Sequence, residues 1–259
     1  MVSSEIQKQR AIDTHSEQAA LFASSYDGIQ QDPYQNCFVY SRKRLNSWLD
    51  RFLPARGDGK ELLDVGCGTG YHLARYRDRG FNITGVDGSA DMLHQARKAN
   101  PGIVFHQSDV DRLSLPDVQF DFALCIEVLR YLPDIAPCLR EMHRTIKPGG
   151  VALVTAAPPL QANCYWPVNR IATALGTKSL TPLKQYFHSA GKLEREFQAA
   201  GFDHVEVHGV YGGMMIWLER VAPSVMPGLL RSWEKIDDLT ADAPFFRHFS
   251  NMFLVRAIK

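Results

Sequence analysis

The stretch Glu61-Leu62-Leu63-Asp64-Val65-Gly66-Cys67-Gly68-Thr69-Gly70 joins a short apolar run to three glycines at alternate positions. The apolar run predicts a buried parallel strand, and residues 71–76 after the glycines predict a helix. Glycines at such a corner let the backbone turn tightly and approach a ligand without a Cβ in the way. Because backbone amides at the start of a helix favour negative charge, the stretch predicts a ligand site at this corner.

The composition is that of an ordinary globular protein. A chain of 259 residues is long enough for one α/β domain with insertions, and 45% apolar and 22% charged residues are typical of a soluble protein. The formal net charge of +1 gives no basic field for a nucleic-acid partner. Five cysteines without a C-x-x-C pair favour neither a disulfide framework nor a zinc ribbon. With no secretory signal and no run of about 18 apolar residues, we expect a cytoplasmic protein without a membrane span.

Strand and helix patterns alternate from Glu61 onward, which predicts a parallel sheet with right-handed crossovers. Six further strands are expected after the first, at 83–86, 104–107, 120–126, 151–155, 205–207 and 251–255. We expect a single domain over 1–259, with a helical N-terminal segment over 1–58, a core over 59–157, and two insertions over 158–188 and 210–248.

Four further motifs follow the glycine corner in a fixed order: Val86-Asp87, Ser108-Asp109, the segment from Phe120-Asp121 to Leu132, and Lys147-Pro148-Gly149-Gly150. Together they resemble the class I S-adenosylmethionine-dependent methyltransferases. The resemblance implies a Rossmann-like α/β fold, with a seven-stranded, mostly parallel sheet and helices on both faces. The last strand would run antiparallel between the fifth and sixth, and the N-terminal helices would form a lid over the cofactor.

The resemblance also implies a cofactor, S-adenosylmethionine, and a product, S-adenosylhomocysteine. Asp87 ends the second strand, where its oxygens would accept both ribose hydroxyls. Asp109 would accept the adenine amino group beside the amide of Val110. A helix cap and a turn aspartate are the structural alternatives for these two carboxylates, and core filling is the alternative for Met92. The full set of implied cofactor contacts is Asp64, Gly66, Cys67, Gly68, Asp87, Gly88, Met92, Asp109, Val110 and Ile126.

The segment 125–132 is where the methyl acceptor would approach in this family. It lacks the Asn/Asp-Pro-Pro-aromatic motif of enzymes that methylate nucleic-acid amines, so the chain resembles the small-molecule branch, similar to quinone and natural-product methyltransferases. Methyl transfer is an in-line displacement to oxygen, nitrogen or carbon, and a general base is needed only when the acceptor must lose a proton.

No catalytic residue is fixed, but His188, before the helix cap Ser189, and Glu127 are the candidate bases. His204 and His208 flank Glu206 on one strand face, which favours an exposed polar face, and we expect no metal.

Aromatic and methionine side chains in the insertions suit a planar or apolar acceptor, although they serve equally well to pack helices on the sheet. Two other functions stay open at this point. A cofactor-binding partner protein without catalysis would keep the same motifs. A nicotinamide oxidoreductase would need a third glycine at the position of Tyr71. We expect a monomer or homodimer, and the candidate pocket residues are Tyr26, Tyr34, Tyr131, Trp166, His188 and Tyr211.

Overall fold

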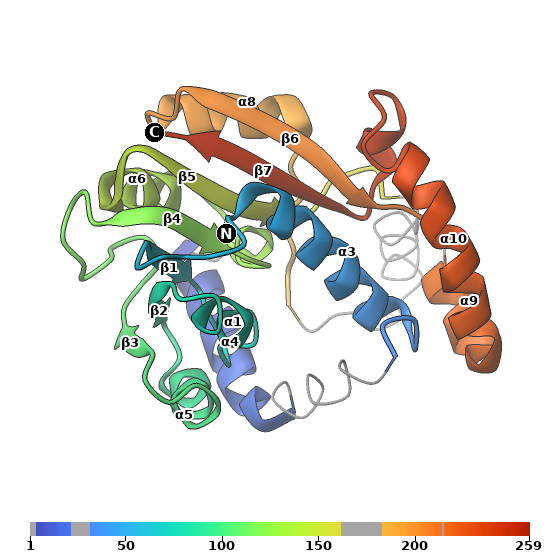
Figure 1. Cartoon of the computed structure of the whole chain (residues 1–259), viewed down its shortest axis with the longest axis horizontal. Helices are drawn as coiled ribbons and strands as arrows, with labels where there is room; N and C mark the ends of the chain where they lie inside the picture. The colour runs from blue at the N-terminus through green and yellow to red at the C-terminus, as the bar shows by residue number, and fades with distance from the viewer. Residues whose placement is uncertain (1–3, 22–31, 162–182, 214) are drawn as a thin grey trace.

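The computed structural model of the protein describes residues 4–21, 32–161, 183–213 and 215–259, without the side chains of 215–217. Within these residues the backbone forms one seven-stranded sheet in the order β3-β2-β1-β4-β5-β7-β6 (Figure 1). The first five strands pair in parallel, while β7 runs antiparallel to both β5 and β6. This is the fold and strand order that the family resemblance implies. The strands are β1 Glu61–Val65, β2 Asn82–Asp87, β3 Val104–Gln107, β4 Phe120–Cys125, β5 Ile146–Ala156, β6 His204–Tyr211 and β7 Met252–Ile258.

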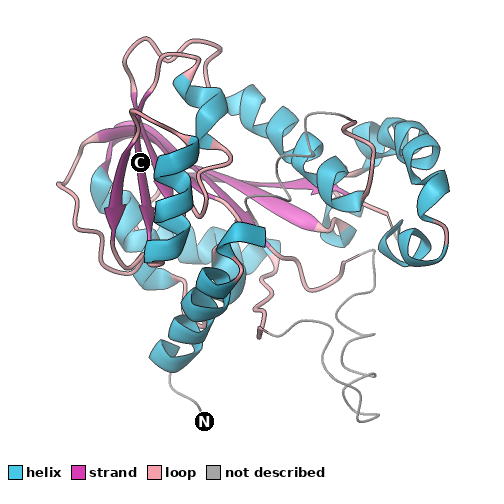
Figure 2. Cartoon of the chain, turned by 90° about the horizontal axis from the view of Figure 1, so that it is seen from below, coloured by secondary structure: helices cyan, strands magenta, loops and turns pink. Residues whose placement is uncertain are grey.

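Helices cover both faces of the sheet and bury two separate apolar cores (Figure 1). One core joins the sheet to α3, α4 and α5, and the other joins it to α6 and α8. The N-terminal helix projects beyond these layers, as the second view shows next to the N label (Figure 2). The helices are α1 Ser4–Glu17, α3 Cys37–Phe52, α4 Leu73–Arg77, α5 Ala90–Ala99, α6 Ala136–Thr145, α8 Ala190–Ala199, α9 Met215–Val221 and α10 Met226–Thr240, with short 3₁₀ turns η2 Leu129–Tyr131, η3 Pro223–Val225 and η4 Phe246–Phe249.

Local sequence signals explain where the helices near the sheet edge begin. The side chain of Asn36 accepts a hydrogen bond from the amide of Val39 at 2.9 Å and caps α3. Ser89 caps α5 in the same way, through the amide of Met92 at 3.1 Å. Each cap satisfies a backbone donor that has no partner inside its own helix. Both helices therefore begin at these caps.

Several boundaries differ from the expectation: β5 already begins at Ile146, β7 continues to Ile258, and two further differences have a visible cause. The helix after the glycine corner begins at Leu73, because Gly70 has a φ of +74° and its carbonyl first accepts the amide of Leu73 in a tight turn at 3.1 Å. Strand β6 continues to Tyr211, which pairs with Met252 of β7 beyond a register shift after Gly209. The strand thus includes the first two residues of the expected second insertion, 210 and 211.

The second insertion packs on α3 through polar contacts as well as apolar ones. The hydroxyl of Tyr40 donates to the buried carboxylate of Asp237 at 2.6 Å, and Arg44 pairs with Asp238 at 2.5 Å. A small apolar cluster of Tyr40, Met226 and Leu230 lies beside them. The insertion thus fixes the N-terminal half of α3 at the end of the sheet.

None of the helices in the described part of the chain combines the length and apolar character that crossing a bilayer requires.

Candidate functional site

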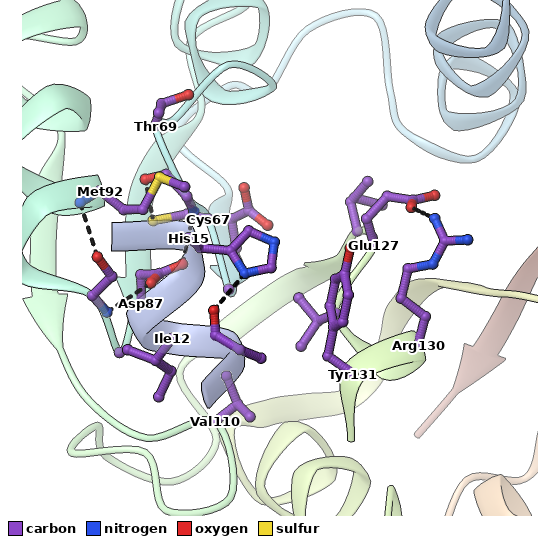
Figure 3. Close-up of a pocket in the computed structure, with 18 of the residues that line it drawn as sticks. Ile12, His15, Cys67, Thr69, Asp87, Met92, Val110, Glu127, Arg130 and Tyr131 are labelled. Atoms are coloured by element: carbon purple, nitrogen blue, oxygen red, sulfur yellow. Dashed lines mark hydrogen bonds and ion pairs between the residues drawn. The ribbon is translucent and has the colours of Figure 1, made fainter. Parts of the chain in front are cut away.

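Two neighbouring cavities lie beyond the carboxyl ends of the parallel strands. The larger one has a volume of about 360 Å³ and is bounded by the loops after β1, β2, β3 and β4 and by α1 (Figure 3). The smaller one has a volume of about 250 Å³ and shares four wall residues with it: Phe38, Arg42, Glu127 and Arg130. In open α/β sheets this edge is where ligands bind.

The glycine corner forms the floor of the larger cavity. Gly66 has a φ of +73°, and a Cβ added there would lie 2.3 Å from Cγ2 of Val128, so only glycine fits. Gly68 also has a positive φ, of +53°, but a Cβ there would meet no atom within 4 Å. Gly66 is therefore packed tightly against the protein, whereas Gly68 borders open space.

Two carboxylates line this floor: Asp64 is buried and Asp87 is half-buried. Asp87 accepts hydrogen bonds from the amides of Gly68 at 2.9 Å and Ser89 at 2.8 Å, so it organises the corner itself. Asp64 is only 2% exposed, and its Oδ1 has no hydrogen-bond partner among the described residues. Burial, with the nearby charge of Asp87, raises the pKa of Asp64 to about 7, and burial also raises the pKa of Asp87. A cationic or hydrogen-bonding ligand would satisfy Asp64.

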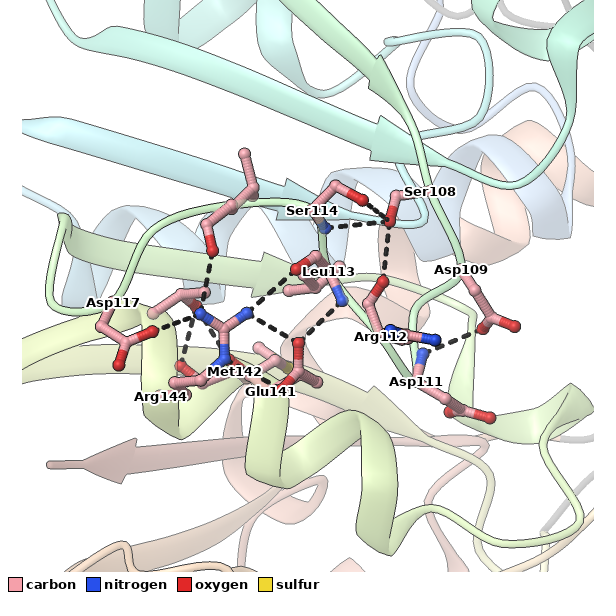
Figure 4. Close-up of polar contacts among 12 residues, drawn as sticks. Ser108, Asp109, Asp111, Arg112, Leu113, Ser114, Asp117, Glu141, Met142 and Arg144 are labelled. Carbon is pink, nitrogen blue, oxygen red and sulfur yellow. Dashed lines mark hydrogen bonds and ion pairs between the residues drawn. The ribbon is translucent and has the colours of Figure 1, made fainter.

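The loop after β3 carries Asp109 and Val110 into the wall, and a polar network anchors it from behind (Figure 4). Glu141 of α6 accepts the amide of Leu113 at 2.7 Å, and Arg144 donates to the carbonyl of Leu113 at 3.0 Å. Asp109 itself accepts the amide of Asp111 at 2.9 Å. The loop is thus fixed at both ends of its turn.

Helix α1 lies across the opening of the larger cavity. The ammonium of Lys8 contacts the carboxylates of Asp109 and Asp111 at 2.6 and 2.7 Å. Farther along the helix, the ring of His15 packs edge-on against Tyr131 with 4.9 Å between ring centroids. Sequence reasoning expected a lid from this part of the chain but named none of the α1 residues that line the cavity. No sequence signal marked these residues, because α1 carries no motif that shows which of its faces lines a cavity. The α1 residues in the wall are Lys8, Ala11, Ile12 and His15.

The wall between the two cavities holds two guanidinium groups around one carboxylate. Arg130 donates through one Nη to Glu127 and through the other to Oε1 of Gln185 at 3.1 Å. The Nη2 atom of Arg42 lies 3.8 Å from the other oxygen of Glu127. Burial raises the pKa of Glu127, but the charges of Arg130 and Arg42 outweigh it and hold this pKa below its ordinary value. Glu127 is therefore an ionised counter-ion.

The sequence-predicted residues fall into four groups, apart from Glu127, which lines both cavities. All ten implied cofactor contacts and Tyr131 lie in the wall of the larger cavity, and Tyr211 lies in the wall of the smaller one. Tyr34 and His188 line neither. Tyr26 and Trp166 lie outside the described residues.

Tyr34 and His188 differ from the expectation for different reasons. The hydroxyl of Tyr34 donates to Glu234 of α10, which turns the ring toward the second insertion. The amide of His188 donates to the carbonyl of Ala157 at 2.9 Å, and the residue is only 3% exposed. Burial lowers the pKa of His188 to about 4, so its ring is neutral. His188 does lie directly before Ser189 and the start of α8, as expected, but its side chain lines neither cavity.

Comparison with known proteins agrees with this geometry. Residues 63–154 match a family model described as a methyltransferase domain. Over 177 residues the chain is 30% identical to the malonyl-acyl-carrier-protein O-methyltransferase of Serratia marcescens, covering 61% of this chain and 69% of that protein. The chain belongs to the S-adenosylmethionine-dependent methyltransferases.

Two further matches are consistent with that family. This methyltransferase is 36% identical over 111 residues to a ubiquinone biosynthesis O-methyltransferase of Pseudomonas aeruginosa, covering 40% of this chain and 46% of that protein. The crystal structure of an S-adenosylmethionine-dependent methyltransferase from Thermotoga maritima superimposes with a TM-score of 0.57 and 21% identity, covering 85% of this chain and 89% of that one. At that identity the structural match shows the fold. The methyltransferase takes S-adenosylmethionine as its cofactor.

Proposed function

We propose that this methyltransferase transfers the methyl group to a small acceptor held in the 250 Å³ cavity. The observation that carries the proposal is the wall shared by the two cavities, which would bring a ligand in each of them together at Glu127 and Arg130. The larger cavity contains every residue that the family resemblance assigns to the cofactor. Bound there, S-adenosylmethionine supplies a methyl group activated by the sulfonium charge.

The residues of the larger cavity fit such a cofactor. Asp64 has an unpartnered, buried Oδ1 that suits a cationic amino group, and Gly68 leaves open space beside it. The carboxylate of Asp87 faces the same cavity from the end of β2, where it would accept the ribose hydroxyls. Hydrogen bonds to a charged group of this kind contribute roughly 1.5–3 kcal/mol each. Holding both ligands in line is then the main catalytic contribution of the protein, and orientation supplies roughly 7–11 kcal/mol in favourable cases.

The smaller cavity favours a small polar acceptor. Its volume of about 250 Å³ lies just below the usual range for sites that hold drug-sized ligands. Ser41, Gln161, Gln185 and Asn251 line it together with the charged wall, so a polar acceptor replaces the apolar or planar one that the aromatic insertions suggested. Both relatives described above are named as O-methyltransferases, which supports oxygen as the methylated atom.

The test is transfer of label from methyl-labelled S-adenosylmethionine by the purified full chain. The low-mass and macromolecular fractions of a cell lysate are offered separately as acceptors. We expect protein-dependent label in a low-mass product, reduced by Asp87→Ala and retained by Asp91→Ala, an exposed aspartate on α5. Label confined to protein or nucleic acid, or no S-adenosylhomocysteine with either fraction, would contradict the proposal.

A further inference from the structure

The shared wall has more positive than negative charge. Among the residues that line the smaller cavity, the charged ones are Arg42, Arg130 and Glu127, so two guanidinium groups face one carboxylate. Tyr211, Cys37 and the remaining lining residues are neutral, because burial raises the pKa of the Tyr211 phenol to about 12 and raises the pKa of the Cys37 thiol well above its usual value. An excess of one positive charge is left for a ligand.

Both arginines also have unused hydrogen-bonding capacity. The Nε atoms of Arg42 and Arg130 are buried and have no partner among the described residues. Arg42 is only 6% exposed, although it lines both cavities. A buried donor without a partner costs about 1–3 kcal/mol, and these two Nε atoms reach a ligand only if the side chains move. Guanidinium groups match the planar, two-oxygen geometry of a carboxylate.

Glu127 is held where an incoming anion would bind. Its φ of +64° lies in the left-handed region, which is unfavourable for glutamate, and its amide donates to the hydroxyl of Thr155 at 2.6 Å. In that position its two oxygens face Arg42 and Arg130. The side chain therefore neutralises part of the arginine charge in the free protein.

The smaller cavity offers no base for an acceptor that must lose a proton. None of the described residues that line it is a histidine, and its one carboxylate is the ion-paired Glu127. The neutral His72 lines only the larger cavity, and burial with the charges of Arg42 and Arg75 lowers its pKa to about 3. An efficient general base needs a pKa near the working pH. The chemistry therefore favours an acceptor that arrives already deprotonated.

We propose that the acceptor is a carboxylic acid, bound as its carboxylate by Arg42 and Arg130 and converted to a methyl ester. The inference rests on the proposed function and names its substrate class. A carboxylate oxygen forms the new bond to the methyl carbon while the methyl–sulfur bond breaks, and that electron pair stays on sulfur. No proton moves, and the products are a neutral ester and S-adenosylhomocysteine. The single negative charge of a carboxylate balances the one excess positive charge of the wall. A cationic amine would be repelled by that charge, and a phosphate dianion would carry more negative charge than the wall can balance.

The first experiment asks how the methyl group is attached. The low-mass product formed with methyl-labelled S-adenosylmethionine is treated with mild alkali, which hydrolyses methyl esters to volatile methanol and leaves N-, C- and ether-linked methyl groups in place. We expect the label to become volatile. A stable low-mass product would overturn the carboxylate acceptor and leave the proposed function intact, whereas absence of any low-mass product would remove both.

The second experiment tests the two arginines. Arg42→Gln and Arg130→Gln should each raise KM for the acceptor in the low-mass lysate fraction at least about tenfold, and by more than they raise the S-adenosylmethionine Kd, although both residues also line the larger cavity. Arg51→Gln is the matched control, because it removes an exposed charge from the same helix. Arg42→Lys keeps the charge if the buried Arg42→Gln variant fails to fold. Unchanged KM in folded Arg42 and Arg130 variants would refute the arginine site.

A competition experiment distinguishes a carboxylate from a phosphate ligand. Propionate, a monocarboxylate with a single negative charge, should inhibit turnover competitively with the acceptor, and this inhibition should weaken in Arg130→Gln. Inorganic phosphate at the same concentration should inhibit much less. Stronger inhibition by phosphate than by propionate would overturn the carboxylate assignment in favour of a phosphorylated acceptor.

Discussion

The two cavities meet at one wall but are built in different ways. The larger one takes most of its wall from short sequence motifs at the ends of consecutive strands, such as the glycine corner and Asp87. The smaller one combines α3, the loop after β4, the end of β5 and the β6–β7 junction, which are far apart in sequence. The cofactor side is thus fixed by the fold itself, whereas the acceptor side depends on how the insertions pack. Substitutions should therefore separate cofactor affinity from acceptor affinity.

The largest expected effect is on the cofactor side. Asp87→Ala removes the acceptor of the Gly68 and Ser89 amides as well as the proposed ribose contact. We expect the S-adenosylmethionine Kd to rise at least about tenfold, equivalent to about 1.4 kcal/mol, in calorimetry. KM for the acceptor at saturating cofactor should stay within about twofold. An unchanged Kd would show that this strand end does not hold the cofactor.

At the shared wall we expect a smaller effect of opposite sign, in which a ligand binds more tightly instead of more weakly. Glu127→Gln removes the counter-ion of Arg42 and Arg130, so a carboxylate acceptor should bind more tightly. We expect KM for the acceptor to fall about threefold with kcat nearly unchanged. A general base would behave differently, because its loss typically lowers kcat by about 10²–10⁴-fold. Steady-state kinetics at saturating S-adenosylmethionine decides between the two roles.

Asp64 allows a test of the cofactor cavity through stability. Burial and the charge of Asp87 raise the pKa of Asp64 from 3.8 to about 7, so the folded chain keeps a proton that the unfolded chain loses. Stability from this group is present below pH 3.8 and is lost as the pH rises to about 7. Asp64→Asn should therefore raise Tm more at about pH 8 than at about pH 5, by at least about 2 °C, or about 1 kcal/mol.

The control for this prediction is cofactor affinity. The same Asp64→Asn variant should bind S-adenosylmethionine more weakly, since an amide cannot supply the negative charge for a cationic amino group. An equal change of Tm at both pH values would show that Asp64 is already ionised in the folded protein. A change in the acceptor KM would show that the two cavities are not separable at this position.

The smallest expected effect concerns the helix over the larger cavity. A Cβ at Gly88 would lie 2.9 Å from Cδ1 of Ile12, the flexible end of an α1 side chain. Gly88→Ala should therefore shift α1 slightly and raise the S-adenosylmethionine Kd about twofold, because the end of a flexible side chain yields at modest cost. Adding Ile12→Ala should restore the affinity in the same titration. No restoration would show that the effect comes from the strand end and not from α1.

The contrast between the cavities also explains what the sequence could predict. Strand ends carry their residues to a known edge, so Asp87 and Asp109 could be placed from the order of the strands, whereas the role of Asp64 inside its strand was implied by the family resemblance. Arg42 could not, because its basic neighbourhood is typical of a solvated helix face and only the packing of α3 buries it. His188 shows the same limit from the other direction. Its place before a helix suggested a pocket residue, but its buried side chain lines neither cavity.

The hairpin connection between β6 and β7 has a further consequence. Tyr211 and Met252 are paired neighbours in the sheet, so the helices between them begin and end at almost the same point. Replacing that segment with one of another length would leave the pairing of the parallel strands unchanged, but it would also remove the contacts that Asp237 and Asp238 make with α3. Directed evolution of new acceptor preferences should therefore target residues 212–251 while keeping these two aspartates.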